Sequence, residues 1–156
     1  MRVSICAVGR LRAGPEKALI EDYKNRFDKT GRALGLGPLT LQEVEDKKNI
    51  GMGAEAKLLR QAIPAGSTTC GLDERGKMMT SVDFAQYLAN FRDQGISKIV
   101  FVIGGADGLE EDLKRSFHSK LSFGKMVWPH MMVRAMLCEQ LYRAASILAC
   151  TPYHRV

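Results

Sequence analysis

The segment Lys98–Ile103, with the sequence KIVFVI, constrains the fold more than any other part of the chain. It is almost entirely apolar and rich in β-branched residues, as expected for a strand of a parallel sheet that is covered on both faces. Four further segments have strand-like patterns, namely residues 2–8, 39–45, 67–72 and 120–127.

Helical patterns alternate with these strands. The predicted helices run from Pro15 to near Gly31, over 52–63, from Thr80 to Gly95, over 109–117, and from Pro129 to about Ala149. Proline suits the first helical turn, where its missing N–H costs nothing, and Thr80 begins a capping-box pattern. We expect a mobile loop at 46–53, a turn at 73–77 and a tail at 151–156. The alternation predicts one α/β domain over residues 1–156, with a mostly parallel sheet.

Length, composition and cysteine spacing favour a soluble cytoplasmic protein without a metal. The 156 residues are 46% hydrophobic and 26% charged, which suits one globular domain with its own core. No apolar run is long enough to cross a bilayer, and Arg10 and Arg12 stand where a signal peptide would have its cleavage site. The four cysteines lack C-x-x-C spacing, so we expect buried reduced thiols rather than zinc ligands or disulfides.

Basic charge points to a polyanionic partner. The formal net charge is +6, and neutralisation of phosphates with release of counterions favours binding to nucleic acid. From residue 125 onward there are four lysines and arginines against a single acid, Glu139. The ending Tyr153-His154-Arg155 combines a stacking ring, a titratable imidazole and a guanidinium, which favours contact with RNA.

A glycine-rich loop, residues 104–108 (GGADG), follows the strand 98–103 directly. Ligands of open α/β sheets collect beyond the carboxyl ends of strands, and glycines let a ligand approach the backbone. The loop has neither the G-x-G-x-x-G pattern nor a Walker lysine, and Glu110 and Glu111 would repel a phosphate. A neutral or cationic ligand therefore fits it better, and a tight turn without any ligand is the alternative.

Two later stretches are also candidates for function. Residues 121–130 (LSFGKMVWPH) have apolar side chains that can wall a flat heterocycle, or else they form a buried strand that leads into a helix. The last helix has a broad apolar face, which serves core packing and leaves a part for a dimer interface. Its Glu139 and Arg143 have the spacing of a surface ion pair.

Motifs in these stretches occur in a fixed order and together resemble one family. The series is Ala7-Val8-Gly9, Leu72-Asp73, Gly76-Lys77, FVIGGADG at 101–108, Leu121-Ser122, Met126, Pro129-His130, Arg134, EQLYRA at 139–144 and PYHR at 152–155. It is similar to the ribosomal RNA large subunit methyltransferase H family, which belongs to the SPOUT, or α/β-knot, methyltransferases. The region from about residue 32 to 66 matches loosely.

The resemblance implies a fold, a cofactor and a substrate. The fold would be a parallel α/β sheet whose C-terminal segment is threaded as a trefoil knot, which is rare among proteins. The cofactor would be S-adenosylmethionine. The substrate would be a pseudouridine in the helix 69 region of 23S ribosomal RNA, methylated at N3 on the assembled 70S ribosome. The enzyme would be a homodimer in which the tail of one subunit completes the site of the other.

The resemblance also implies roles for individual residues. Cofactor binding would involve Leu72, Gly104, Gly105, Phe123, Gly124, Lys125, Met126, Val127 and Trp128. Catalytic candidates are His154, Tyr153, Arg143 and His130, and RNA contacts are Arg134, Arg143 and Arg155. Either histidine is a candidate base for the N3 proton. No metal ligand is implied, because the methyl group of a sulfonium is already activated.

Three other classes of protein remain as alternatives. A non-enzymatic ribosome-binding or RNA-binding protein on the same scaffold would keep the basic tail and lack cofactor affinity. A hydrolase that uses Cys138 or Cys150 with a histidine lacks a supporting signature. A generic nucleotide-binding α/β protein is disfavoured by the acidic residues that follow Gly108.

Overall fold

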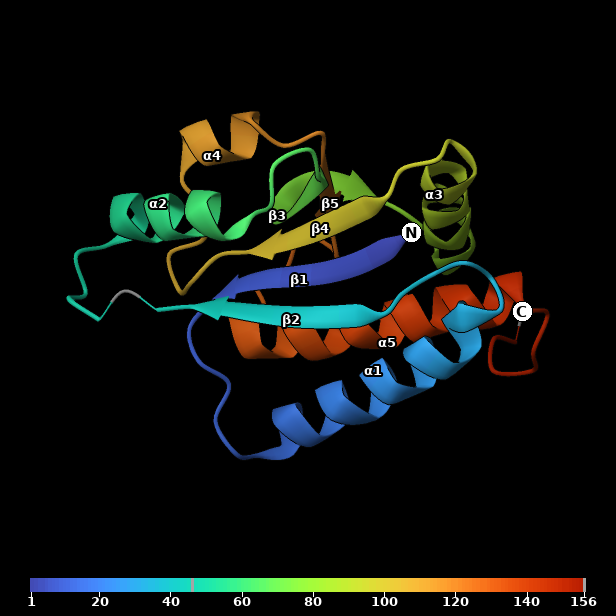
Figure 1. The fold of residues 1–156 in the computed structure, drawn as a ribbon. Helices are drawn as coiled ribbons and strands as arrows, with labels where there is room; N and C mark the ends of the chain where they lie inside the picture. The colour runs from blue at the N-terminus through green and yellow to red at the C-terminus, as the bar shows by residue number, and fades with distance from the viewer. Residues whose placement is uncertain (46, 156) are drawn as a thin grey trace.

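A parallel sheet forms the centre of the molecule in the computed structural model, which describes residues 1–45 and 47–155. Within these residues the strand order is β2-β1-β4-β3-β5, and all neighbouring strands are parallel. The strands are β1 (Arg2–Val8), β2 (Leu39–Val44), β3 (Thr68–Met78), β4 (Lys98–Ile103) and β5 (Ser119–Ser122). Figure 1 shows β1, β2 and β4 side by side and pointing in one direction. The predicted α/β class with a parallel sheet is confirmed.

Helices cover both faces of this sheet. They are α1 (Pro15–Arg32), α2 (Met52–Ala62), α3 (Ser81–Asp93), α4 (Glu111–Arg115) and α5 (His130–Leu148). One apolar cluster joins the sheet to α1, α3 and α5, and a second, smaller cluster joins it to α2 and α4. In Figure 1, α2 and α4 accordingly lie above the sheet and α1 and α5 below it. None of the described helices is long and apolar enough to cross a membrane.

The alternation of side chains along β4 explains why its sequence is apolar from Ile99 onward. Ile99, Phe101 and Ile103 belong to the larger cluster, whereas Val100 and Val102 belong to the smaller one. All five are 0–3% exposed. Successive residues of a strand point to opposite faces, and each fully buried side chain of this size contributes about 1.5–3 kcal/mol. Between residues 99 and 103 there is therefore no position at which a polar side chain would reach water.

Strand β3 is longer than predicted, because it continues through the expected turn at 73–77 as far as Met78. The pairing with β5 is interrupted there, since Leu72 and Lys77 both pair with Leu121. Residues 73–76 do not pair with β5, and the pairing resumes at Lys77. Gly76 permits the pairing to resume, because a Cβ there would lie 2.7 Å from the Leu121 carbonyl carbon. The predicted turn is thus a bulge within a strand.

Two elements are shorter than predicted. Helix α4 has five residues, Glu111–Arg115, because Leu109 is buried before it and the Ser116 hydroxyl donates to the Leu113 carbonyl at its end. Strand β5 ends at Ser122 rather than at residue 127. Gly124 follows with φ +119° and donates its N–H to the Ser122 hydroxyl, which turns the chain away from the sheet.

The expected loop at 46–53 and tail at 151–156 each include a position outside the described residues. These positions are Asp46 and Val156. Helix α2 begins at Met52, within the range expected to be a loop. The described part of the tail, residues 151–155, contains neither helix nor strand.

A buried arginine, Arg134, joins α5 to the carboxyl ends of β1 and β2. Its guanidinium donates to the Val8 carbonyl through Nη2, and Nη1 lies 3.3 Å from Glu43 Oε1. The Arg134 side chain is 0% exposed and that of Glu43 is 29% exposed. Burial lowers the pKa of Arg134, and the charge of Glu43 opposes this effect. The arginine stays charged, because its ordinary pKa lies far above neutrality.

The burial of Arg134 contradicts its predicted role as an RNA contact. All of its surface is covered by protein in this structure. The helix turns this residue towards Glu43, which is 91 positions away in the sequence. Arg134 therefore holds secondary-structure elements together rather than facing a ligand.

We predict that Glu43→Ala lowers the free energy of unfolding by about 2–4 kcal/mol, because it leaves the buried charge of Arg134 without its counterion. The double variant Glu43→Ala/Arg134→Met removes both charges and should lose less stability than Glu43→Ala alone. Urea unfolding of the wild type, of Glu43→Ala, of Arg134→Met and of the double variant measures the differences. A double variant that loses the sum of both single losses would show that the two side chains act independently.

Candidate active site

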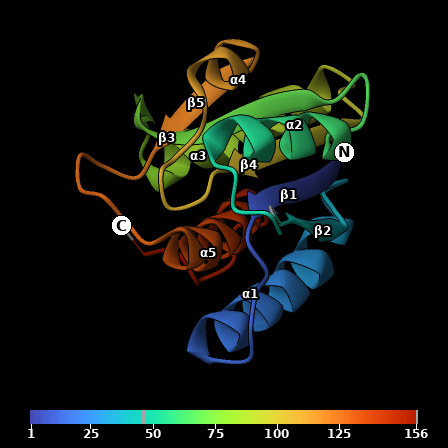
Figure 2. The ribbon, with the colours of Figure 1, turned by 90° about the vertical axis from the view of Figure 1, so that its left-hand side faces the viewer.

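A cavity of about 310 Å³ opens at the carboxyl end of β4, beside the bulge of β3. Its lining comes from residues 72–75 at the bulge of β3, the 104–109 loop, α4, the segment that follows β5 and the start of α5. Figure 2 views this edge of the sheet, where the segment between β5 and α5 extends away from the strands. The sequence-predicted residues on its wall are Leu72, Gly104, Gly105, Phe123, Gly124, Met126, Val127, Trp128 and His130.

The glycine loop after β4 is closed by its own backbone. The Gly108 N–H donates to the Gly105 carbonyl at 3.1 Å, and Gly108 has φ +84°. A Cβ on Gly104 would lie 2.5 Å from the Gly108 carbonyl carbon, so that position excludes any side chain. The loop presents backbone to the cavity, as the ligand-binding interpretation of this stretch expected. The tight turn is present, and it also lines a cavity.

In the segment 123–128 the strand has ended, Phe123 and Gly124 are half-buried and residues 125–128 are exposed, so the interpretation of residues 121–130 as a buried strand is wrong beyond Ser122. Met126 is 72% exposed, Val127 82% and Trp128 39%. Isolated apolar residues are common on surfaces, but three in succession beside a cavity are an open apolar wall. Lys125 belongs to this segment, yet it is absent from the described residues that line the cavity.

Acidic side chains outnumber basic ones on the cavity wall. Asp73, Glu74, Asp107 and Glu111 line it, against Arg75 and Lys114. Lys114 is itself paired with Asp73 at 3.0 Å and with Glu111 at 2.5 Å. Although burial opposes the change, hydrogen bonds from the Arg75 backbone and from Lys114 lower the pKa of Asp73 overall, so it is ionised. This environment favours a ligand with positive charge, in agreement with the sequence-based expectation.

The pair formed by Asp73 and Lys114 is a feature that sequence reasoning missed. Both side chains are largely buried, with 11% and 14% exposure, and they join the bulge of β3 to α4. The Leu72-Asp73 motif was a signal for this position, but the interpretation of 73–77 as a simple turn concealed it. Lys114 gave no signal, because an amphipathic helix of five residues has no recognisable pattern.

His130 is the catalytic candidate that lies at this cavity. It is the first residue of α5, and a Cβ on Gly9 would lie 3.4 Å from its Nε2. Burial lowers the pKa of His130, and the positive charge of Arg134 lowers it further. Its imidazole is therefore neutral at pH 7, and one ring nitrogen is free of a proton and able to accept one.

The other catalytic candidates form a second cluster at the far end of α5. Glu139 Oε1 accepts hydrogen bonds from Arg143 Nε at 2.9 Å and from the Tyr153 hydroxyl at 3.0 Å. His154 Nδ1 lies 3.5 Å from Arg143 Nη1, and the Arg143 guanidinium lies over the Tyr153 ring at 4.7 Å. Burial, followed by the neighbouring Tyr23 and Glu139, raises the pKa of Tyr153. The expected ion pair of Glu139 and Arg143 is present at 2.5 Å.

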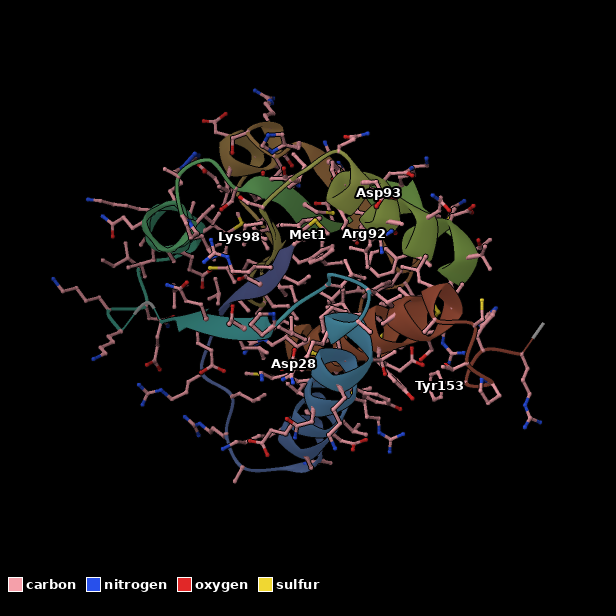
Figure 3. All side chains as sticks on the ribbon, turned by 45° about the vertical axis from the view of Figure 1, so that its right-hand side comes forward. Met1, Asp28, Arg92, Asp93, Lys98 and Tyr153 are labelled. Atoms are coloured by element: carbon pink, nitrogen blue, oxygen red, sulfur yellow. The ribbon has the colours of Figure 1, made fainter. Side chains whose placement is uncertain are left out.

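The two clusters are far apart within one chain. His130 and Arg143 are separated by 13 positions of one helix, which corresponds to about 20 Å. In Figure 1, α5 runs from the carboxyl edge of the sheet to its opposite edge, where the chain ends. Figure 3 shows Tyr153 beside the last part of α5. A single protomer thus does not bring Tyr153 or His154 to the cavity that His130 lines, and Arg155 follows them in the tail.

An apolar groove of about 540 Å³ lies on α5 beside the cavity. Its lining comes from α1, the end of β3, the start of α3, residues 121–124 and α5. Leu19, Met78 and Met132 line it and are 44%, 61% and 37% exposed. By contrast, Leu137 and Leu141 of the same helix are fully buried. The apolar face of α5 therefore divides into a core part and an exposed part, as its breadth predicted.

All four cysteines lie in the described residues and are free thiols. Cys6, Cys70 and Cys138 are buried as expected, whereas Cys150 is exposed, because it follows the end of α5 with φ 54°. Burial raises the pKa of Cys138 to about 12, so its thiol is protonated and unsuited to nucleophilic attack. In the described residues no group of three or more His, Cys, Asp or Glu has an arrangement that could hold a metal ion.

Comparison with known proteins identifies close relatives along the whole chain. A family model described as "Predicted SPOUT methyltransferase" matches residues 1–154. Proteins named "Ribosomal RNA large subunit methyltransferase H" are similar throughout. The protein of Ruegeria sp. (strain TM1040) is 65% identical over 156 residues and that of Dinoroseobacter shibae 62% over 156, each covering 100% of both chains. The protein of Paracoccus denitrificans is 58% identical over 155 residues, or 99% of each chain.

Solved structures of lower identity share the fold. A probable methylase family protein from Haemophilus influenzae Rd KW20 has a TM-score of 0.56 at 14% identity, over 99% of this chain and 70% of the other. A probable methyltransferase from Bordetella pertussis Tohama I has a TM-score of 0.51 at 13% identity, over 92% and 96%. The family match and the full-length relatives carry the assignment. The chain belongs to the SPOUT methyltransferase family and, within it, to the ribosomal RNA large subunit methyltransferase H family.

Proposed function

We propose that this protein uses S-adenosylmethionine to methylate N3 of a pseudouridine in 23S ribosomal RNA, in the helix 69 region, on the assembled ribosome in the cytoplasm. The observation that carries the proposal is the cavity between the glycine loop and the apolar segment 123–128, in a chain of the SPOUT family. The name shared by the relatives supports a large-subunit RNA substrate. The net charge of +6 suits a polyanionic partner.

The lining of the cavity fits a cofactor with a flat heterocycle and a positively charged sulfur. The side chains of Met126, Val127 and Trp128 offer an apolar wall for a ring. Because Gly104 has no side chain, the 104–108 loop can close with the Gly108 carbonyl against it. Asp73 and Glu111 provide the negative charge that a sulfonium favours. In the proposed fold, the segment 123–128 belongs to the trefoil knot that the family resemblance implies.

The cofactor supplies a methyl group on positively charged sulfur, and the acceptor nitrogen must give up its proton. His130 is neutral, lines the cavity and is held in place through α5. We assign to it the acceptance of the N3 proton, because a base must be unprotonated at the working pH and within hydrogen-bond reach of the proton. Holding methyl donor and acceptor in line supplies much of the remaining rate.

The tail takes part in the proposed reaction from a second copy of the chain. Arg143, which contacts His154 and the Tyr153 ring, lies 13 positions or about 20 Å along α5 from His130 of its own protomer. The exposed apolar groove, with Leu19, Met78 and Met132, adjoins the cavity and shares Leu121, Phe123 and Gly124 with it. A partner that covers this groove brings its own surface next to the cavity. In a homodimer the tail of that partner would supply Tyr153 and His154 to stack on and orient the base, with Arg155 as an RNA contact.

We expect Gly104→Ala to weaken binding of S-adenosylmethionine by about tenfold or more, because the added methyl group forces the 104–108 loop apart. Calorimetric titration of the folded variant measures the affinity. Gly53→Ala is the matched control, since a Cβ on Gly53 meets nothing within 4 Å, and its affinity should equal that of the wild type. Wild-type affinity in a folded Gly104→Ala protein would place the cofactor elsewhere. Absence of binding to the wild type would favour the non-enzymatic ribosome-binding protein.

The substrate is tested in cells that lack the protein. Mass spectrometry of their 23S RNA should show one pseudouridine without its methyl group, and expression of the wild-type chain should restore it. His130→Ala should restore it at a rate reduced by about 10²–10⁴-fold in single-turnover assays, the range expected for a lost general base. Unchanged methylation of 23S RNA in the absence of the protein would exclude this substrate.

Mixed dimers test whether the tail acts on the partner's cavity. We expect Gly104→Ala and Tyr153→Ala/His154→Ala to be nearly inactive when each is expressed alone. When they are co-expressed, each heterodimer has one intact cavity facing one intact tail. Random assembly should therefore restore roughly a quarter of the wild-type activity per protomer. If each cavity used the tail of its own chain, co-expression would restore nothing.

A further inference from the structure

We infer that the loop between β1 and α1, residues 9–14, is a phosphate-binding rim for the RNA substrate, with Arg10 and Arg12 as its contacts. The inference rests on the proposed function, because it assigns part of the RNA surface of that same site. Neither the family motifs nor the cavity lining includes these two arginines.

The loop begins at the mouth of the cavity. Gly9 follows β1 with φ +90°, and a Cβ there would lie 3.4 Å from Nε2 of His130, which lines the cavity. Val8, the last residue of β1, borders the glycine loop, because a Cβ on Gly105 would lie 3.2 Å from Val8 Cγ1. The chain therefore leaves β1 between the proposed base and the cofactor loop.

The start of the loop is held in one position. The Gly9 N–H donates to the Val44 carbonyl at 2.8 Å, and the Leu11 N–H donates to Glu43 Oε1 at 2.8 Å. The same Glu43 oxygen pairs with the buried Arg134. Leu11 also packs against the larger apolar cluster. Leu11 is thus fixed by its backbone N–H and by its side chain. Its two sequence neighbours, Arg10 and Arg12, are therefore held at a defined position.

The two neighbours of Leu11 are arginines that reach the surface and have no acidic partner among the described residues. Arg10 and Arg12 are exposed, and neither forms an ion pair with any residue of 1–45 or 47–155. Arg26 and Arg60 differ, since they pair with Asp22 and Glu110. The loop 9–14 (GRLRAG) contains no acid of its own. Its positive charge is available to an external anion.

Such a loop suits the backbone of RNA better than a small anion. Two guanidiniums on one short segment match successive phosphates, and contacts to phosphates fix the register of a nucleic acid on a protein. A backbone that is already ordered loses little entropy when it binds. The acidic cavity interior and the basic rim then divide the site, with the cationic cofactor inside and the polyanionic substrate at the mouth.

The test compares two charge-matched variants on ribosomes from cells that lack the protein. Arg10→Gln/Arg12→Gln removes the rim charges. Arg2→Gln/Lys98→Gln removes two charges at the opposite edge of the same sheet, where β1 and β4 begin, and Figure 3 labels Lys98 there. For each protein we would measure KM and kcat of methylation, the affinity for S-adenosylmethionine, and ribosome binding at several salt concentrations.

We expect the rim variant to raise KM for ribosomes by about tenfold and to reduce the salt dependence of binding by about one to two counterions. Its cofactor affinity and kcat should stay at wild-type values, and the control variant should match the wild type throughout. A rim variant that binds ribosomes as the control does would overturn the inference. If the wild type binds ribosomes without methylating them, the proposed function fails, while the binding measurements still decide the role of the rim.

Discussion

The contact of Arg134 with Val8 and Glu43 is the constraint on which the geometry of the site depends. It joins the first strand, the second strand and the last helix at one point. The helix start that it fixes carries His130, whose pKa is lowered by burial and further by the charge of Arg134. Buried ion pairs are often no more stabilising than apolar replacements. The ion pair of Arg134 and Glu43 instead acts by positioning, because it holds β1, β2 and α5 in fixed places beside the cavity.

Most of the framework could be predicted from local sequence. The bounds of β1 and β4 agree with the prediction, because central strands are buried on both faces and their apolar pattern starts and stops with the strand. Helices α1 and α3 begin where Pro15 and the Thr80 capping box predict. The glycine loop after β4 was correctly placed at a cavity, since the carboxyl edge of a parallel sheet is set by topology.

What the sequence concealed depends on contacts between distant segments. The bulge in β3 requires Gly76 to lie against the backbone of Leu121, and a pattern of turn residues does not reveal such an approach. Arg134 looks like a surface residue until Glu43 is placed beside it. The segment 123–128 looks like a core strand, because exposed apolar residues at a site carry the same pattern as buried ones.

The strand order also determines when the sheet can close during synthesis. Strand β1 pairs on one side with β2, which follows it closely, and on the other side with β4, which ends at Ile103. Between the completion of β2 and of β4, that second edge of β1 has no native neighbour. At the usual pace of translation this interval lasts roughly 3–12 s. An unpaired edge of this kind invites association with other chains, so the nascent protein passes through a period in which chaperone protection matters more than the stability of the finished fold.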